Sequence, residues 1–589
     1  MSAFRFLIVA SSFILLLPVG LFGQREMGTD IEKAKLSPMK GQVVLYLSTL
    51  FNDRQPMAIC AANSSDKPKA LIVDLSPGTL SRLEQAARSC EVMCRYAKEH
   101  GQECVAIRPC GRGNGTVCQG YGDNDVYEAI AAAKEVSAID EDRIYVTGAS
   151  MEGASTFFHS SHRPDFWAAA APFCGYCDYK LWEKPGGTTF DRQPWEEHSW
   201  IARGAAYRPE NFRHLPIRMT HGEWDRGVGG GVPTEHSRQM ARKLKALEYP
   251  HLYVEVPKTG HGCRTPETWK AAIGWLLEQT RKKNANRISL VVHTLRHNRA
   301  YWLAVEQQQV SGKRSTVEAT LDRSSGTLNV QTTNVGRIRL GPIPETESLT
   351  LKLDGTSTSD VDLTVQQRLA RSQKGVWSQV RKASVDQQKK PRVSGPFGDL
   401  FYAPTVIVYG TAGSDAETNF TQLMSRDMPN FYRRYNGGVH RGGIPGDNVV
   451  RFPTISDQEA LSILKSGTPV TSQGIKVDKD LLDRANFFLL GNHKSNRLFA
   501  MLSEGIPLEV GERSLTLAGK TYEGENVACI TILPHPDGTR YVAVLAGCSP
   551  DAITWASHLN LQLLPDYLVF DRGQTIDWGF FDNHWQTKR

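Results

Sequence analysis

Long apolar runs are missing from this sequence beyond its first residues. After that start, no stretch of the 589 residues is apolar enough to span a bilayer. Charge of one sign is also scarce, because 69 basic residues stand among 62 acidic ones and leave a net charge of +7. Without a dense Lys/Arg stripe, we expect no nucleic-acid partner. The 40% hydrophobic and 22% charged fractions are typical of a globular protein. Its length predicts about two to four domains.

Cofactor signatures are absent too. Glycine follows two expected strands of the C-terminal region, at Gly410 and Gly491, but neither turn has a dinucleotide fingerprint or a phosphate loop. The single C-x-x-C, at Cys174 and Cys177, has no second pair of zinc ligands. We therefore expect neither a cofactor nor a metal. No internal repeat is present.

The N-terminus has the composition of a secretory signal peptide. Arg5 precedes an apolar run from Phe6 to Leu17, and Pro18 and small residues follow up to Gly23. A short positive start, an apolar middle and a helix-breaking end are typical of such a signal. The expected location is secreted or periplasmic, with no stable membrane insertion after cleavage. An uncleaved anchor is the alternative.

Cysteine is plentiful for an exported chain, with eleven residues, nine of them before residue 264. Cys110 and Cys118 flank a Gly-rich segment, and Cys174 and Cys177 form a close pair, so either pair could be bridged. An odd count leaves at least one thiol unpaired or in an intermolecular bond. The disulfide connectivity and the oligomeric state stay open.

Three regions separate by pattern. From about residue 43 to 278, short apolar strands alternate with helical segments, which predicts a mostly parallel sheet covered on both faces. From about 288 to 353 the strands alternate apolar and polar residues, as in a small β module. From about 401 onward strands and helices alternate again. The fold class is therefore α/β, with a small β module and a second, smaller α/β domain.

The chemistry is concentrated at Ser150. An apolar strand from Ile144 runs into the turn Gly148-Ala149-Ser150, and a helix can follow it. Such a nucleophile elbow lifts the serine hydroxyl clear of the sheet and brings the next N–H, that of Met151, near a developing oxyanion. Gly148 allows the turn to pack closely.

Two later turns supply the partners that a serine nucleophile needs. Asp225 follows a short strand from Ile217, and His261 follows another from Leu252 and is flanked by glycine. A serine hydroxyl needs an imidazole to take its proton, and the imidazole needs a carboxylate to fix its tautomer. Serine, acid and histidine each follow their own strand. They occur along the chain in the order that is typical of hydrolases with a nucleophile elbow.

From about residue 43 to 278 the sequence resembles the catalytic domain of the prolyl oligopeptidase family, within the α/β-hydrolases. The resemblance includes an entry hairpin, the segments IRPCGRGNG from residue 107 and IDEDRIYVTGAS from residue 139, the HGEWD turn from residue 221, and GHG around His261. It implies that Ser150 is the nucleophile, Asp225 the triad acid and His261 the base. Family members cleave peptides or, in related branches, esters through an acyl-enzyme.

This resemblance completes the expected organisation: an α/β-hydrolase domain, then the small β module, then the smaller α/β domain. The expected bounds are a signal peptide at 1–23, the hydrolase domain at 24–283, the β module at 284–369, a linker at 370–396 and the C-terminal α/β domain at 397–589.

One departure from the family pattern lies in the elbow. The residue two positions after the nucleophile is normally glycine, and here it is Glu152. Its carboxylate must point to solvent, find a partner or crowd the turn.

A second departure lies in the oxyanion loop. The strand that begins at Ala70 ends in Leu75-Ser76-Pro77, where the family has an H-G-G whose backbone supplies an oxyanion donor. Met151 N–H remains as one donor. An N–H of Leu75 or Ser76 could be the second, whereas Pro77 has none. We expect the oxyanion hole at Met151 and Ser76.

A long insertion separates the expected strand at 168–173 from the acid turn. It carries Trp182, Trp195, Trp200 and Tyr207. In this fold such a segment covers the active site as a lid. These aromatic side chains then line an apolar substrate pocket, or they simply pack the lid onto the core.

The leading interpretation is a secreted serine hydrolase, a prolyl oligopeptidase-like serine peptidase with a peptide substrate. The family's usual β-propeller does not fit before Val43, so a carboxylic ester hydrolase for acetyl or feruloyl esters is the runner-up. A third alternative is a catalytically impaired binding protein, disabled by Glu152 and the altered oxyanion loop.

Overall fold

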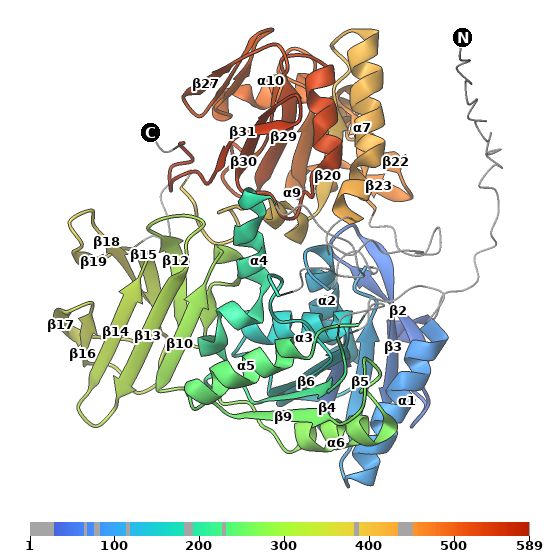
Figure 1. The fold of residues 1–589 in the computed structure, drawn as a ribbon, viewed down its shortest axis with the longest axis vertical. Coiled ribbons are helices and arrows are strands. Elements are labelled where there is room, and N and C mark those ends of the chain that lie inside the picture. The colour runs from blue at the N-terminus through green and yellow to red at the C-terminus, as the bar shows by residue number, and fades with distance from the viewer. Residues whose placement is uncertain are drawn as a thin grey trace, which may run out of the picture.

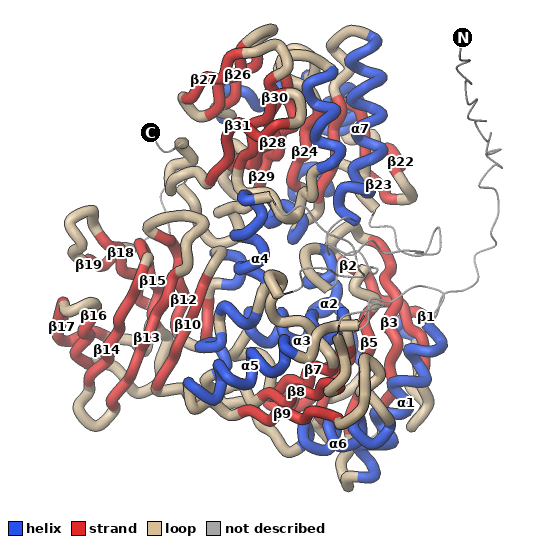
Figure 2. The backbone as a smooth tube through the Cα atoms, viewed as in Figure 1, coloured by secondary structure: helices blue, strands red, loops and turns tan. Residues whose placement is uncertain are grey.

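The computed structural model describes residues 29–63, 67–75, 83–112, 118–181, 193–226, 231–381, 388–433 and 451–587. The expected signal peptide lies outside these residues. Figure 1 shows three regions: a lower α/β domain, a β module beside it and a second α/β domain above both. Helices and strands alternate in the two α/β domains, whereas the β module consists almost entirely of strands (Figure 2). In the described part of the chain, no helix is long and apolar enough to cross a membrane.

The first domain is built on a nine-stranded sheet with the order β1-β2-β3-β5-β4-β6-β7-β8-β9. An antiparallel hairpin, β2 and β3, leads into strands that run parallel from β5 and β4 to β9. This exchange of β4 and β5 is the strand order of an α/β-hydrolase, so the expected fold is confirmed. The strands are β1 Thr29–Asp30, β2 Gln42–Ser48, β3 Asp53–Ala61, β4 Lys69–Asp74, β5 Cys104–Pro109, β6 Ile139–Ala149, β7 Ala169–Phe173, β8 Ile217–Gly222 and β9 His251–Val256.

Helices cover both faces of this sheet because its central strands are apolar on both sides. Helices α1 and α6 bury residues in one core cluster, and α2, α3 and α5 bury residues in another. In β4, for example, every residue is buried, which is typical of a parallel strand between two helical layers. The helices are α1 Leu83–Glu99, α2 Tyr121–Val136, α3 Met151–His162, α4 Glu197–Arg203, α5 Glu235–Ala246 and α6 Pro266–Leu277.

The β module contains two five-stranded sheets, β10-β13-β14-β16-β17 and β11-β12-β15-β18-β19. Their apolar side chains form one buried cluster, as expected for alternating strands with one face toward a core. The strands are β10 Arg287–Val292, β11 Arg299–Ala300, β12 Leu303–Gln308, β13 Ser315–Asp322, β14 Thr327–Thr333, β15 Val335–Leu340, β16 Leu349–Leu353, β17 Thr356–Val361, β18 Gln367–Arg371 and β19 Trp377–Gln379.

The expected linker at 370–396 is wrong at both ends. β18 pairs there with β19, the edge strand of its sheet, and the many polar, partly exposed residues of the two strands hide the strand pattern. Further on, Lys389 forms a buried ion pair with Asp566 of the C-terminal domain. The N–H of Ser394 donates to the hydroxyl of Tyr541 at 2.7 Å. Residues 388–396 are therefore packed structure.

The C-terminal domain has a seven-stranded sheet with the order β21-β20-β24-β29-β28-β30-β31. The first four strands are parallel, and the last three pair antiparallel. The sheet strands are β20 Thr405–Tyr409, β21 Thr454–Ser456, β24 Asn486–Leu490, β28 Val527–Pro534, β29 Tyr541–Gly547, β30 Tyr567–Asp571 and β31 Gln574–Gly579. Smaller sheets pair β22 Val470–Ser472 with β23 Ile475–Val477, and β25 Leu508–Val510, β26 Ser514–Leu517 and β27 Lys520–Glu523. The helices are α7 Asp415–Arg433, α8 Asp457–Ser466, α9 Lys479–Arg484 and α10 Arg497–Leu502.

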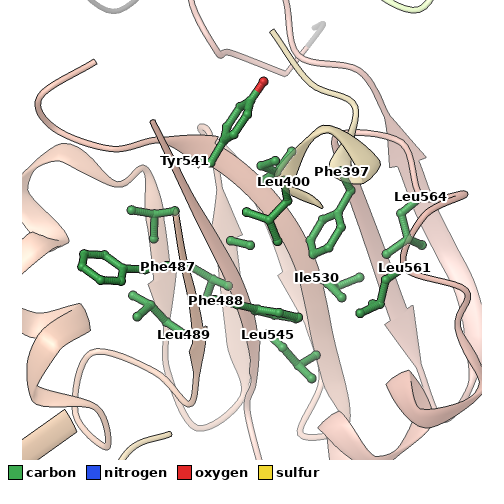
Figure 3. Close-up of a cluster of buried hydrophobic side chains, with 14 of the residues drawn as sticks. Phe397, Leu400, Phe487, Phe488, Leu489, Ile530, Tyr541, Leu545, Leu561 and Leu564 are labelled. Carbon is green, nitrogen blue, oxygen red and sulfur yellow. The ribbon is translucent and has the colours of Figure 1, made fainter. Parts of the chain in front are cut away.

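Figure 3 shows the core of this domain, where Phe488 of β24 and Leu545 of β29 lie near Phe397 and Leu400. The last two belong to a short 3-10 helix, Phe397–Tyr402. All four side chains are buried.

The insertion between β7 and β8 contacts both α/β domains. Trp195 and Trp200 are buried in the same cluster as the C-terminal core. In α4, Ser199 Oγ and an Arg203 side-chain nitrogen donate to the carbonyl of Gln562, at 3.2 and 2.9 Å. The packing alternative therefore holds for these two tryptophans, whereas Trp182 lies outside the described residues.

Leu489→Ala tests whether the C-terminal core is cooperative. Leu489 is fully buried in β24, so we expect a loss of about 2–5 kcal/mol in the free energy of unfolding. Leu423→Ala is the control, because that side chain is 55% exposed and its loss should change stability by less than about 0.5 kcal/mol. Urea unfolding followed by tryptophan fluorescence measures both; equal destabilisation would contradict the packing described.

Candidate active site

The nucleophile elbow is a tight turn between β6 and α3. Ser150 has φ 63° and ψ −118°, a conformation that a side-chain-bearing residue rarely adopts. Its N–H donates to the carbonyl of Phe173 at 2.8 Å, so the turn is tied to the neighbouring strand β7. The serine side chain is thereby presented at the carboxyl edge of the sheet.

Two glycines allow this turn to pack. A Cβ on Gly148 would lie 2.5 Å from the carbonyl oxygen of Glu152, and one on Gly153 would lie 2.5 Å from that of Phe173. Both approaches exclude any larger residue. The Cβ of Glu152 is itself one of the atoms that a Cβ on Gly148 would meet, at 2.7 Å, so Gly148 leaves room for the side chain that departs from the family pattern.

The three predicted triad residues meet. His261 Nε2 lies 2.7 Å from Ser150 Oγ, and its Nδ1 lies 2.6 Å from Asp225 Oδ2. The hydroxyl of Ser150 can donate to Nε2 while the Nδ1–H donates to the carboxylate. This arrangement can deprotonate the serine during attack on a carbonyl.

The acid turn and the histidine turn are bonded to each other. The N–H of Trp224 donates to the carbonyl of Thr259 at 2.9 Å. A Cβ on Gly222 would collide with the carbonyl oxygen of Gly260, so only glycine permits the approach. Backbone contacts therefore set the separation of Asp225 from His261.

His221 is a partner of the triad acid that the sequence analysis did not identify. Its Nε2 lies 3.4 Å from Asp225 Oδ2 and 2.9 Å from the Val232 carbonyl, and its Nδ1 lies 2.8 Å from Ser237 Oγ. The N–H of Val232 donates to Asp225 Oδ1 at 2.9 Å. In the HGEWD segment, His221 stands four residues before Asp225. This spacing was the one sign in the sequence that the two side chains could meet.

These contacts set the charge of the triad. Burial acts to raise the pKa of Asp225, but its hydrogen bonds with His221 and His261 hold it well below its usual range. Burial acts to lower the pKa of His261, but the hydrogen bond to Asp225 and nearby negative charge, including Glu152, raise it above 6.5. An ionised acid therefore faces a more basic imidazole.

The predicted oxyanion hole is described only in part. Met151 begins α3 directly after the nucleophile, where helix N–H groups favour negative charge. Ser76 lies outside the described residues. The alternative donor Leu75 is wrong, because its N–H donates to the carbonyl of Thr147 at 2.8 Å.

A buried ionic cluster lies beside the elbow. Asp74, fully buried at the end of β4, pairs with Arg108 Nε at 3.2 Å and with an Arg264 side-chain nitrogen at 3.0 Å. Glu152 is close enough to interact with both arginines, yet burial raises the pKa of its carboxyl to about 7. Glu152 therefore carries a partial charge near neutrality. The pairing of Asp74 with residues far along the chain had no signal in the sequence.

The cysteines are free thiols in the structure, all eleven of them described. Neither of the two pairs that the sequence allowed to bridge, Cys110 with Cys118 or Cys174 with Cys177, is bonded. Cys177 Sγ lies 3.1 Å from the carbonyl of His236, whereas Cys174 Sγ lies 2.7 Å from Cys263 Sγ. Cys174, Asp225 and His261 also form a cluster that could hold a metal, but two of its members already bond each other as triad partners.

Comparison with known proteins agrees with this geometry. Residues 116–280 match the model of the prolyl oligopeptidase family, a segment that contains all three triad residues. The predicted resemblance is thus confirmed, as is an enzyme of the serine hydrolase type.

Individual relatives and solved structures are only distantly similar to this chain. An uncharacterized secreted protein of Arthroderma benhamiae is 32% identical over 136 residues, which are 21% of this chain and 13% of that protein. The serine hydrolase FphF of Staphylococcus aureus, a fluorophosphonate-binding protein, is 16% identical over 41% of this chain and 100% of its own, with a TM-score of 0.32. A puromycin-hydrolyzing peptidase of Mycobacterium tuberculosis is 16% identical over 42% of this chain and 41% of its own, with a TM-score of 0.33.

Asp225→Asn tests the role of the acid. The amide would favour the wrong imidazole tautomer, so we expect the rate of reaction with a fluorophosphonate to fall by about 10⁴-fold. Asp178→Asn is the control: this buried carboxylate accepts from Tyr207 and Gln239 and lies outside the triad. Equal rates in the two variants would remove Asp225 from the site.

The pH dependence tests the influence of Glu152. Attack by Ser150 needs a neutral His261, so the labelling rate should rise with pH through a midpoint above 6.5. Glu152→Gln removes a negative charge that raises the imidazole pKa, and the midpoint should move to lower pH. Glu223→Gln, an exposed carboxylate in the acid turn, should leave the midpoint in place. A midpoint that stays unmoved in Glu152→Gln would show that the two groups do not interact.

Proposed function

We propose that this protein is an exported serine hydrolase, a prolyl oligopeptidase-like peptidase that acts through an acyl-enzyme on Ser150. The observation that carries the proposal is the continuous hydrogen-bonded line from Ser150 Oγ through His261 to Asp225, at 2.7 and 2.6 Å. Export is supported by the signal-like N-terminus and by the secreted relative. Peptide is the first choice of substrate because of the family match.

In the proposed mechanism, Ser150 Oγ attacks the substrate carbonyl while His261 Nε2 takes its proton. Asp225 stabilises the imidazolium that forms, because its own low pKa keeps it ionised. The N–H of Met151 and that of Ser76 would bind the oxyanion. The imidazolium then protonates the leaving amine, and water, deprotonated by the same imidazole, hydrolyses the acyl-enzyme.

A carboxylic ester is the second candidate substrate, of the acetyl or feruloyl type. Leu75 is one of two candidate oxyanion donors after β4, but its N–H already donates to the carbonyl of Thr147. Each missing oxyanion donor removes about 2.7–4 kcal/mol of transition-state stabilisation. Esters have better leaving groups than amides and need less of that stabilisation, so a poorer oxyanion hole would favour them.

A fluorophosphonate probe tests the hydrolase proposal directly. We expect one probe per chain, with labelling lost in Ser150→Ala. Ser160→Ala is the matched control, since Ser160 is a buried serine of the same helix whose hydroxyl donates to Thr156 at 2.7 Å. An intact wild type that stays unlabelled would favour the catalytically impaired binding protein. Aminoacyl-proline amides compared with p-nitrophenyl and feruloyl esters then separate peptidase from esterase.

A further inference from the structure

Two cysteines lie directly behind the catalytic histidine. Cys174 is the residue after β7, and Cys263 lies two residues beyond His261. Their sulfur atoms are 2.7 Å apart although 89 positions separate them in the sequence. Both side chains are buried. The pair therefore connects the strand that supports the elbow with the turn that carries the base.

The surroundings hold both sulfurs in place. The N–H of Cys174 donates to the carbonyl of Thr220 in β8 at 2.9 Å, and Cys263 Sγ lies 3.6 Å from the same oxygen. Cys174 Sγ also lies 3.1 Å from the carbonyl oxygen of His261. Cys174 has φ 41°, an unfavourable conformation for a residue with a side chain. The backbone thus directs the two thiols toward each other, next to the main chain of the turn that carries His261.

The spacing differs from that of the other close cysteines. Cys94 Sγ and Cys104 Sγ are 3.8 Å apart, as in an ordinary thiol contact. The 2.7 Å between Cys174 and Cys263 is closer than unbonded sulfurs approach, and about 0.65 Å of further movement reaches the length of a disulfide. Small rotations of the two side chains would provide it.

We propose that Cys174 and Cys263 form a disulfide that positions His261. In its formation each thiol loses a proton, the new S–S bond forms, and two electrons pass to the disulfide of a thiol–disulfide exchange partner, which leaves as two thiols. Because both sulfurs are buried in the folded chain, the bond forms during folding, in the oxidising compartment to which the chain is exported.

The consequence for catalysis rests on the proposed hydrolase activity, whereas the bond rests only on the proposed export. A covalent link from β7 to the residue two after His261 limits movement of the imidazole away from Ser150. A displacement of about 1 Å at a reacting group can cost up to about 100-fold in rate. The disulfide would keep base and nucleophile in register.

Peptide mapping tests the bond without any activity. The full chain, refolded with oxidised and reduced glutathione, is denatured with iodoacetamide and no reductant, then digested with trypsin. We expect the peptide 259–264, which holds Cys263, linked to the peptide of Cys174 and two hydrogens lighter than the separate thiols. That second peptide also contains Cys177, so the link must persist in Cys177→Ser and disappear in Cys174→Ser. A fully alkylated Cys263 in the wild type would overturn the proposal.

Fluorophosphonate kinetics test the positioning role. In Cys174→Ser and Cys263→Ser we expect the labelling rate to fall about tenfold while the labelled fraction stays stoichiometric. A purely structural role would instead lower the labelled fraction, because misfolded chains do not react. Cys177→Ser, which removes another buried thiol near the lid, should label at the wild-type rate. Unchanged rates in both bridge variants would remove the positioning role, and a wild type that never labels would refute only the hydrolase proposal.

Discussion

An imidazole placed between a hydroxyl and a carboxylate is the constraint around which the first domain is arranged. The 2.7 and 2.6 Å contacts of His261 require three turns from three strands to meet within one side chain's reach. The elbow brings Ser150 within reach of His261 because Ser150 adopts a positive φ. The acid and histidine turns are held together by backbone bonds, with Gly222 allowing their contact.

The charged groups around the triad are positioned by specific contacts, as the triad residues are. His221 and the N–H of Val232 both support Asp225, so the carboxylate stays ionised in a buried place. Beside the elbow, Asp74 pairs with two arginines, and burial raises the pKa of the neighbouring Glu152 to about 7. The departure at Glu152 therefore adds a titratable group to the site rather than closing the turn.

The sequence allowed the triad to be predicted because each member follows its own strand, and strand order alone brings such turns to one edge. The α/β-hydrolase fold followed from the same alternation. The linker prediction failed because β18 and the edge strand β19 carry many polar, partly exposed residues, and so resemble a loop in composition. The contacts of Asp74 with Arg264 and of Cys174 with Cys263 were beyond prediction, since local patterns do not report which distant residues become neighbours.

The docking of α4 also bears on how the chain can be divided. Trp195 and Trp200 belong to the hydrolase domain in sequence, yet they complete the core of the C-terminal domain. A truncated chain that ended before residue 397 would lose part of the apolar cluster around both indoles and the carbonyl of Gln562 that Ser199 and Arg203 contact. Packing therefore crosses the boundary that is visible along the sequence, and any division of the chain near residue 397 has to replace the contacts of α4.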